Sequence, residues 1–218
     1  MLTPPELKLE RLYPKPPVVE DCSDIDRVLK KLRRPEKIVD KRPPQSIGRL
    51  TSDEIEIYRA VLGQWVAEDH APLNVSLQTY PLETRSSSGS AIPCKCLSNI
   101  DPMSLFAASR SVHILNRDVL PLRSMRLLDF SEQTTTIQKH DPANLIRDGK
   151  SVDIAVAEGF GSGVFSLSEI AFDKVHRHAI VSYGFQCGML CGSGLTIVFE
   201  KVGNGWKRAS LECGGWIS

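Results

Sequence analysis

The residues most able to do chemistry lie near the end of the chain, in the stretch CGMLCGSG and the two histidines that precede it. Three residues separate Cys187 from Cys191, Cys213 follows, and His176 and His178 come before them. A thiol becomes a catalytic nucleophile when a neighbouring group such as an imidazole lowers its pKa. The two histidines are the nearest such groups in the sequence.

A structural zinc site is a second interpretation of the same residues. Zinc takes four ligands in such sites, and a spacing of three residues between two cysteines lies within the usual range. Two histidines that are two residues apart on a strand share one face and can hold one ion together. The candidate ligands are Cys187, Cys191, Cys213, Cys94, Cys96, His176 and His178. We expect no cofactor, and structural zinc is the one alternative that these residues leave open.

The third interpretation is structural, and the sequence favours it. Two cysteines at the base of a hairpin can come within disulfide distance, and a cysteine on the following strand can compete for either of them. The chain has six cysteines, so several pairings are possible, and the sequence does not choose among them. We expect disulfides or buried free thiols and assign no catalytic residue. The disulfide candidates are Cys187, Cys191, Cys213, Cys94 and Cys96.

Two glycine-rich stretches, GFGSG at 159–163 and CGSG at 191–194, invite other interpretations. Neither follows the nucleophile-elbow or the phosphate-loop pattern. Both are expected to lead into strands, so neither offers a helix N-terminus to a phosphate. We expect these glycines to supply the positive φ angles of tight hairpin turns. The glycosylation triplet that begins at Asn74 lies in an expected strand and carries little weight.

The elements that must position these residues follow from local patterns. Thr51 and Glu54 stand in capping-box spacing before a helical apolar stripe. Asp-Pro pairs at Asp101 and Asp141 predict the starts of two short helices. The expected strands are 74–80, 123–130, 133–138, 151–159, 164–173, 178–186, 194–202 and 206–212.

The order of these elements indicates the fold class. Short connections between the last strands favour an antiparallel meander. We expect an α+β fold, with helices of the first part packed on a C-terminal antiparallel meander sheet of about four to six strands. Residues 49–218 are expected to form a single domain, and residues 1–48 a proline-rich, basic N-terminal arm that is largely extended or disordered.

The expected arm has a distinct composition. It holds eight of the 14 prolines, and residues 27–42 carry eight basic and two acidic residues. Such a segment suits an anionic partner or a solvated chain, and the lack of interleaved aromatic residues favours the solvated chain. A protein partner that docks through this arm is a further possibility.

The overall composition narrows the classes of function. The chain has 218 residues, a formal net charge of +1 and 41% hydrophobic residues, so nucleic acid is not expected as a partner. No apolar run is long enough for a transmembrane segment. No secretory signal is visible at the start, so the sequence as it stands predicts a cytoplasmic protein, or an exported one if an upstream signal peptide is missing.

The last quarter of the chain, Gly163 to Ser218, contains a CG-x-L-CG-x-G loop, then EK and GW, and a terminal WIS. In these motifs it resembles a group of bacterial proteins that has no known activity. The resemblance implies a bacterial α+β protein and no reaction, and many members of the group are exported. The stretch EKVGNGWK is also similar, at the level of fold, to cystatin-like domains. The matching residues are Leu167, Ser168, Phe172, Cys187, Gly188, Cys191, Gly192, Gly194, Glu200, Lys201, Gly205, Trp206, Trp216 and Ser218.

The sequence favours a non-catalytic binding or interaction protein, because no nucleophile motif, cofactor loop or acid–base pair is evident. One alternative is a small hydrolase-like enzyme with a site near His176, His178, Cys187 and Cys191. The other alternative is a structural zinc-binding protein.

Overall fold

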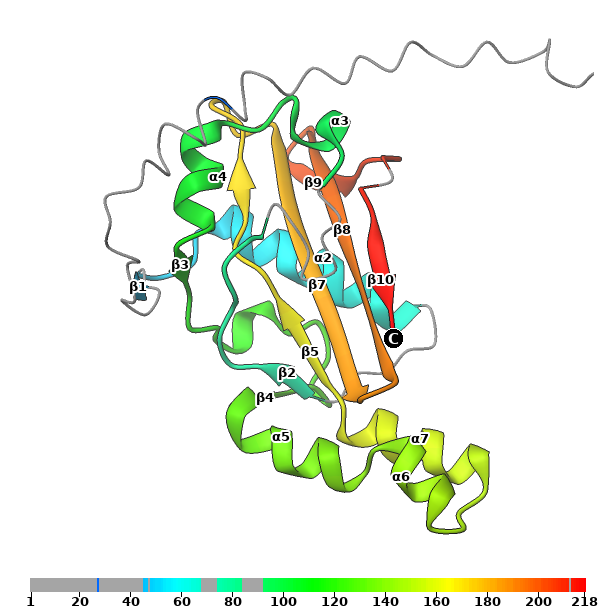
Figure 1. Ribbon diagram of the computed structural model, residues 1–218. Helices are drawn as coiled ribbons and strands as arrows, with labels where there is room; N and C mark the ends of the chain where they lie inside the picture. Colours follow the sequence, from blue (N-terminus) through cyan, green and yellow to red (C-terminus); the bar gives the residue numbers. More distant parts are fainter. Residues whose placement is uncertain (1–26, 28–44, 47, 68–73, 84–91, 212) are drawn as a thin grey trace, which may run out of the picture.

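The computed structural model describes residues 27, 45–46, 48–67, 74–83, 92–211 and 213–218. The prediction for the N-terminal arm therefore falls almost entirely outside the described residues. The described part is α+β, as predicted, with helices packed on a mixed sheet of eight strands (Figure 1). Within it, no helix is long and apolar enough to cross a membrane.

The first half of the described chain is mainly helical, and three of its helices, those that follow Thr51, Asp101 and Asp141, begin where the sequence predicts. Thr51 and Glu54 form a capping box, in which the Glu54 N–H donates to Thr51 Oγ1 at 3.3 Å and the Thr51 N–H donates to Glu54 Oε2 at 2.7 Å. The carboxylates of Asp101 and Asp141 cap the two Asp-Pro helices. The elements are β1 (Gln45–Ser46), α2 (Ser52–Ala67), β2 (Asn74–Ser76), α3 (Cys94–Leu97), α4 (Pro102–Ala108), β3 (Ser111–Val112), η2 (Arg117–Val119), β4 (Arg126–Leu128), α5 (Phe130–Lys139) and α6 (Pro142–Arg147).

The second half contains one helix followed by most of the large sheet. Its elements are α7 (Val152–Ser162), β5 (Val164–Leu167), β6 (Ala171–Phe172), β7 (His178–Gly188), β8 (Cys191–Val202), β9 (Gly205–Arg208) and β10 (Gly215–Ile217). The strand order is β10-β8-β7-β5-β2-β4, with β6 beside β7 and β9 beside β8. The C-terminal pairs are antiparallel, as predicted. The sheet is larger than predicted because β2 joins it in parallel with both β4 and β5.

Two hydrophobic layers pack against the sheet, one on each face. Helix α2 covers one face, while α3 and α4 cover the other (Figure 1). Along β7, Ala179 and Val181 belong to the layer with α2, and Ile180 between them belongs to the opposite layer. This alternation follows from the pleat, in which successive side chains point to opposite faces. The sheet is thus buried on both faces at this end of β7.

Two predicted strands are helices in the structure. The expected strand 133–138 lies in α5, which Asp129 caps by accepting a hydrogen bond from the Ser131 N–H at 2.8 Å. The expected strand 151–159 and the glycine turn after it form α7. The prediction failed there because Val152, Ile154 and Val156 alternate as they would in a strand. The buried residues of α7 instead follow helical spacing and are small: Ala155, Gly159 and Ser162.

The prediction for the hairpin glycines is also wrong. Strand β7 reaches Gly188 and β8 begins at Cys191, so Met189 and Leu190 alone form the turn. Gly192 and Gly194 lie inside β8 rather than in a turn. Among the described residues, the glycines with positive φ are Gly149, Gly203 and Gly214.

Candidate interaction surface

The structure does not bring the predicted histidines and cysteines together. His178 is the first residue of β7 and Cys187 is near its other end. Nine steps of about 3.3 Å along a strand separate them by roughly 30 Å. The four residues of the hydrolase-like alternative, His176, His178, Cys187 and Cys191, therefore lie in two separate places.

Each histidine instead has a local partner. The His176 ring stacks on Phe172 with the ring centroids 4.7 Å apart. His178 Nδ1 lies 3.1 Å from Asp173 Oδ2. Partial burial disfavours the charged Asp173 carboxylate, but the hydrogen bonds from His178 and from the Arg177 backbone N–H together outweigh this and hold the pKa of Asp173 below its ordinary value. These contacts stabilise the turn between β6 and β7.

The cysteines lie in pairs at disulfide distance. Cys187 and Cys191 face each other across the end of the β7–β8 hairpin, with their Cα atoms 5.1 Å apart. Cys96 of α3 and Cys213 before β10 have a Cα–Cα distance of 5.8 Å. Both distances are typical of disulfides. Cys94 is also disulfide-bonded.

The pairing of Cys213 bears on the zinc interpretation. Cys213 lies with Cys96 in the layer beneath α3 and α4, whereas Cys187 belongs to the layer of α2. Within the described residues, no three cysteine, histidine, aspartate or glutamate side chains cluster as a metal site requires. The three cysteines proposed as zinc ligands are thus divided between two places.

The turn of the β7–β8 hairpin is fixed from two sides. The Cys187–Cys191 pair spans its base. Asp141, the N-cap of α6, accepts one hydrogen bond from the Ala143 N–H at 2.9 Å and another from the Met189 N–H at 2.6 Å. A Cβ on Gly188 would lie 2.9 Å from Asp141 Cγ, so the close approach of the carboxylate requires glycine there. One buried carboxylate thus joins the helical segment to the hairpin turn.

This fixed turn presents two large apolar side chains to solvent. Met189 is 82% exposed and Leu190 is 76% exposed. They stand where β7 and β8 meet, beside α7 (Figure 1). A pair of large exposed apolar side chains on a constrained turn is a feature of contact sites.

Helix α7 extends the apolar surface. Its small residues face inward, and a Cβ on Gly159 would lie 2.6 Å from Pro142 Cγ of α6. Val152, Val156 and Phe160, spaced by four residues along one side of the helix, are exposed. Phe160 also contacts Phe185 of β7, with the ring centroids 5.2 Å apart. We define the tip surface as Met189, Leu190, Val152, Val156 and Phe160.

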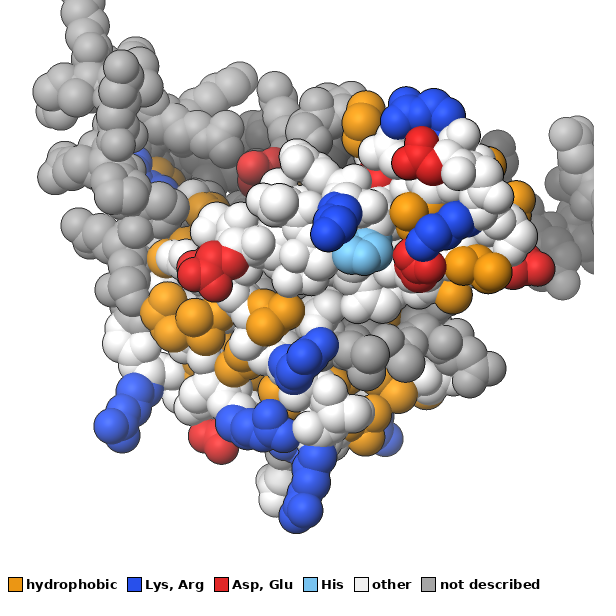
Figure 2. All heavy atoms as spheres, turned by 90° about the horizontal axis from the view of Figure 1, so that it is seen from below, with side chains coloured by type: hydrophobic (Ala, Val, Ile, Leu, Met, Phe, Trp, Pro, Cys, Tyr) orange, Lys and Arg blue, Asp and Glu red, His pale blue; other side chains and the backbone are white. Residues whose placement is uncertain are grey.

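Charges of both signs surround the tip surface. Lys150 Nζ pairs with Glu158 Oε2 at 2.7 Å beside α7. The end of the molecule built from α5, α6, α7 and the hairpin shows hydrophobic side chains in several groups among both basic and acidic ones (Figure 2). Mutual neutralisation of this kind gives the surface no strong attraction for a polyanion.

A buried polar cluster lies elsewhere, and the sequence gives no sign of it. Glu169 is 3% exposed, and its Oε2 atom lies 2.9 Å from His113 Nδ1. The Thr79 hydroxyl donates to Glu169 Oε1, and the Ser111 hydroxyl donates to Oε2 at 3.4 Å. His113 and Glu169 are 56 positions apart in the sequence. Because both side chains are buried and these bonds tie β3 to the loop after β5, the cluster is suited to holding the fold together.

The same cluster acts on a neighbouring tyrosine. Burial, together with the nearby charge of Glu169, raises the pKa of Tyr58 well above its ordinary value. Tyr58 stays a hydrogen-bond donor, and its hydroxyl donates to the Ser168 carbonyl at 2.9 Å. Asn74 is likewise buried, and its side-chain amide donates to the Gly163 carbonyl at 3.0 Å. The glycosylation triplet is therefore not presented to solvent.

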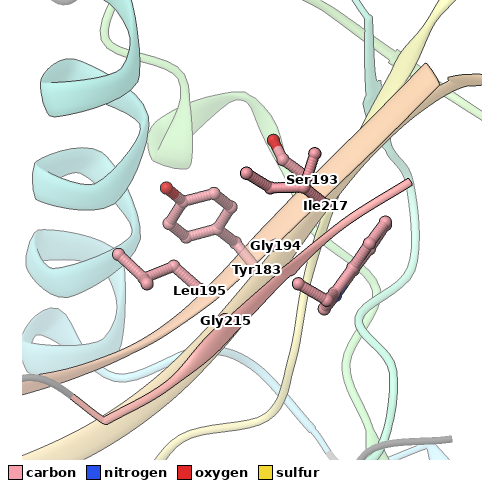
Figure 3. Close-up of a pocket in the computed structure, with 7 residues that line it drawn as sticks. Tyr183, Ser193, Gly194, Leu195, Gly215 and Ile217 are labelled. Atoms are coloured by element: carbon pink, nitrogen blue, oxygen red, sulfur yellow. The ribbon is translucent and has the colours of Figure 1, made fainter. Parts of the chain in front are cut away.

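An open groove of about 500 Å³ runs beside the edge strand β10. Figure 3 shows Tyr183 of β7 and Leu195 of β8 pointing from the sheet toward α2. Ser193 lies further along β8, opposite Ile217 of β10. Ile217 is 90% exposed. The lining residues are Tyr183, Ser193, Gly194, Leu195, Gly215, Trp216 and Ile217.

Comparison of the chain with protein-family models, with curated proteins and with solved structures finds no match. The C-terminal resemblance to a bacterial group stays a prediction.

Proposed function

We propose that this protein is a non-catalytic binding protein whose tip surface contacts a protein partner. The observation that carries the proposal is the exposed Met189–Leu190 pair on a turn that Asp141 and the Cys187–Cys191 pair hold in place. Burial of one large apolar side chain contributes about 1.5–3 kcal/mol. A turn that is already fixed loses little conformational freedom on binding, so more of this energy is available for affinity.

The side chains of the tip surface indicate which kind of partner it would bind. Its five residues are all apolar, and the nearby Lys150 and Glu158 neutralise each other. A folded protein with an apolar depression fits this surface, with affinity that depends little on salt because screening acts on charges. The predicted absence of a nucleic-acid partner is kept in this proposal.

We also propose that the protein works in an oxidising compartment, such as the bacterial envelope. The two cysteine pairs at disulfide distance support this, because disulfides persist outside the reducing cytosol. Intact mass of the purified protein before and after thiol alkylation, with and without reductant, counts its disulfides. Protein that alkylates fully without reductant would contradict the proposal.

The binding proposal is tested by capture from an extract of the producing cells. The bait is the full chain, the double variant Met189→Ser/Leu190→Ser, or the control Val175→Ser. Val175 is also an exposed apolar residue, but it lies in the turn before β7. We expect a protein that the wild type and the control retain and the double variant loses. Equal retention by all three baits, or retention by none, would overturn the proposal.

A further inference from the structure

Within the part of the chain that the structure describes, the backbone groups on the outer side of the edge strand β10 have no hydrogen-bond partner. On its inner side, the Thr196 N–H donates to the Gly214 carbonyl at 3.0 Å and the Ser218 N–H donates to the Gly192 carbonyl at 2.9 Å. Trp216 is opposite Gly194 in this register. Hydrogen-bonded and non-hydrogen-bonded positions alternate along an antiparallel pair. The N–H and C=O groups of Gly215 and Ile217 therefore point outward, away from the sheet.

The outward backbone groups of β10 can pair with those of a second β10 strand. If two copies of β10 lie antiparallel about a two-fold axis at Trp216, Gly215 of each copy is opposite Ile217 of the other. These are the residues whose backbone groups point outward, so each opposed pair exchanges two hydrogen bonds. The two strands would form four hydrogen bonds in all. Isologous pairing of this kind closes as a dimer and does not propagate into a fibre.

The side chains also fit this register. Ile217 is 90% exposed, and the residue opposite it, Gly215, has no side chain. The groove beside Gly215 is lined by Tyr183 and Leu195 and is open to the partner's isoleucine (Figure 3). Trp216 faces the other side of the sheet and lies over glycines, so the two strands can approach at the axis.

The strand at the opposite edge of the sheet, β4, is less suited to pairing with a second copy. Strand β4 begins with Arg126, and a charged side chain on an edge strand discourages pairing with another chain. Strand β10 is Gly-Trp-Ile and carries neither charge nor proline. We propose that two copies of this protein pair through β10 and continue the sheet across a two-fold axis at Trp216. The proposal uses residues distinct from the tip surface and does not depend on it.

Sedimentation velocity across a concentration series tests the pairing with the full-length protein. We expect wild type to shift from monomer to dimer as concentration rises. Ile217→Pro removes an outward N–H, and with it two of the four intermolecular bonds, while Ile217→Lys puts a charge on the edge. Each is expected to weaken dimerisation by at least about tenfold. Val175→Lys, at an exposed site away from β10, should leave dimerisation unchanged.

Disulfide crosslinking is a second test, and it traps the dimer instead of weakening it. At a non-hydrogen-bonded antiparallel pair the two Cα atoms lie about 4.5 Å apart, within disulfide reach. Trp216→Cys should therefore form a covalent dimer on mild oxidation, whereas Val175→Cys should not. A wild type that stays monomeric at every concentration would overturn the proposal, and so would Ile217 variants that dimerise as tightly as wild type.

Discussion

The indole of Trp216 lies directly over the backbone of Gly194, on the face of the sheet opposite α2. A Cβ on Gly194 would come within 2.7 Å of both Trp216 Cε2 and the Tyr183 carbonyl oxygen. Gly192 and Gly184 flank the same ring, and a Cβ there would lie 3.0 and 3.3 Å from it. Three glycines in two adjacent strands thus form the floor on which one aromatic ring rests.

Gly194→Ala should therefore displace Trp216 and destabilise the fold. The Tyr183 carbonyl belongs to the backbone and cannot move aside, so we expect a loss of about 1–3 kcal/mol in the free energy of unfolding. Urea titration measures the loss, and tryptophan emission should shift to longer wavelength as the ring moves into water. Gly63→Ala is the control, because a Cβ there meets nothing within 4 Å and alanine favours its helix. Equal stability of the two variants would contradict the close packing of Trp216 on Gly194.

Two glycines in α7 provide a matched pair for the packing of the helical segment. A Cβ on Gly159 would lie 2.6 Å from Pro142 Cγ, whereas a Cβ on Gly161 meets nothing within 4 Å. We expect Gly159→Ala to lower the free energy of unfolding by about 1–3 kcal/mol. Gly161→Ala should be neutral or stabilise by up to about 1 kcal/mol. Thermal unfolding of both variants checks the difference, and a stabilised Gly159→Ala would show that α7 does not pack closely on α6.

Asp141 should matter more for the hairpin turn than for the helix that it caps. Asparagine is also a good N-cap, so Asp141→Asn can keep the bond to Ala143, but its NH₂ group then faces the Met189 N–H. We expect a loss of about 1–3 kcal/mol and faster hydrogen exchange of the Met189 amide. Asp129→Asn, at the exposed cap of α5, should be nearly neutral. Unchanged exchange at Met189 would mean that Asp141 does not hold the turn.

The ion pair between Asp53 and Lys201 should make stability depend on pH at the acidic end. Partial burial disfavours the Asp53 charge, but hydrogen bonding and attraction from Lys201, at 3.0 Å, hold the pKa of Asp53 below its ordinary value. A lowered pKa in the folded state stabilises above the unfolded value of about 3.9. This contribution is lost as the pH falls through the lowered pKa of the folded protein.

We expect Asp53→Asn to cost about 0.5–1 kcal/mol at pH 7, since both side chains are partly exposed. The difference from wild type should shrink toward zero near pH 2, which chemical denaturation at a series of pH values measures. In a Lys201→Gln background the substitution should cost less at pH 7. A cost that stays constant from pH 7 to pH 2 would argue against the ion pair.

Much of the fold could be predicted from local signals. The capping box at Thr51 and the Asp-Pro starts at Asp101 and Asp141 act within a few residues, so the sequence displays them directly. Helix α7 is not predictable in this way, because its exposed valines and isoleucine alternate as in a strand. Only the packing of Gly159 on Pro142 reveals a helix with small residues inside.

The sites depend on contacts that the sequence does not display. Asp141 contacts Met189, which is 48 positions away, and His113 contacts Glu169, which is 56 positions away. No local sequence pattern predicts either contact. The sequence displays the C-terminal glycines, but their role under Trp216 follows from the register of β7, β8 and β10. The Cys187–Cys191 pairing could be anticipated because only three residues separate the two.

Site-specific photocrosslinking in the producing cells tests the central claim most directly. A benzophenone amino acid replaces Leu190 on the tip surface or, as the control, the equally solvent-facing Val175. We expect one discrete heterologous protein adduct from position 190 on irradiation and none from position 175. An absence of adducts at position 190, or the same adducts from both positions, would contradict the assignment of the tip surface as a binding site.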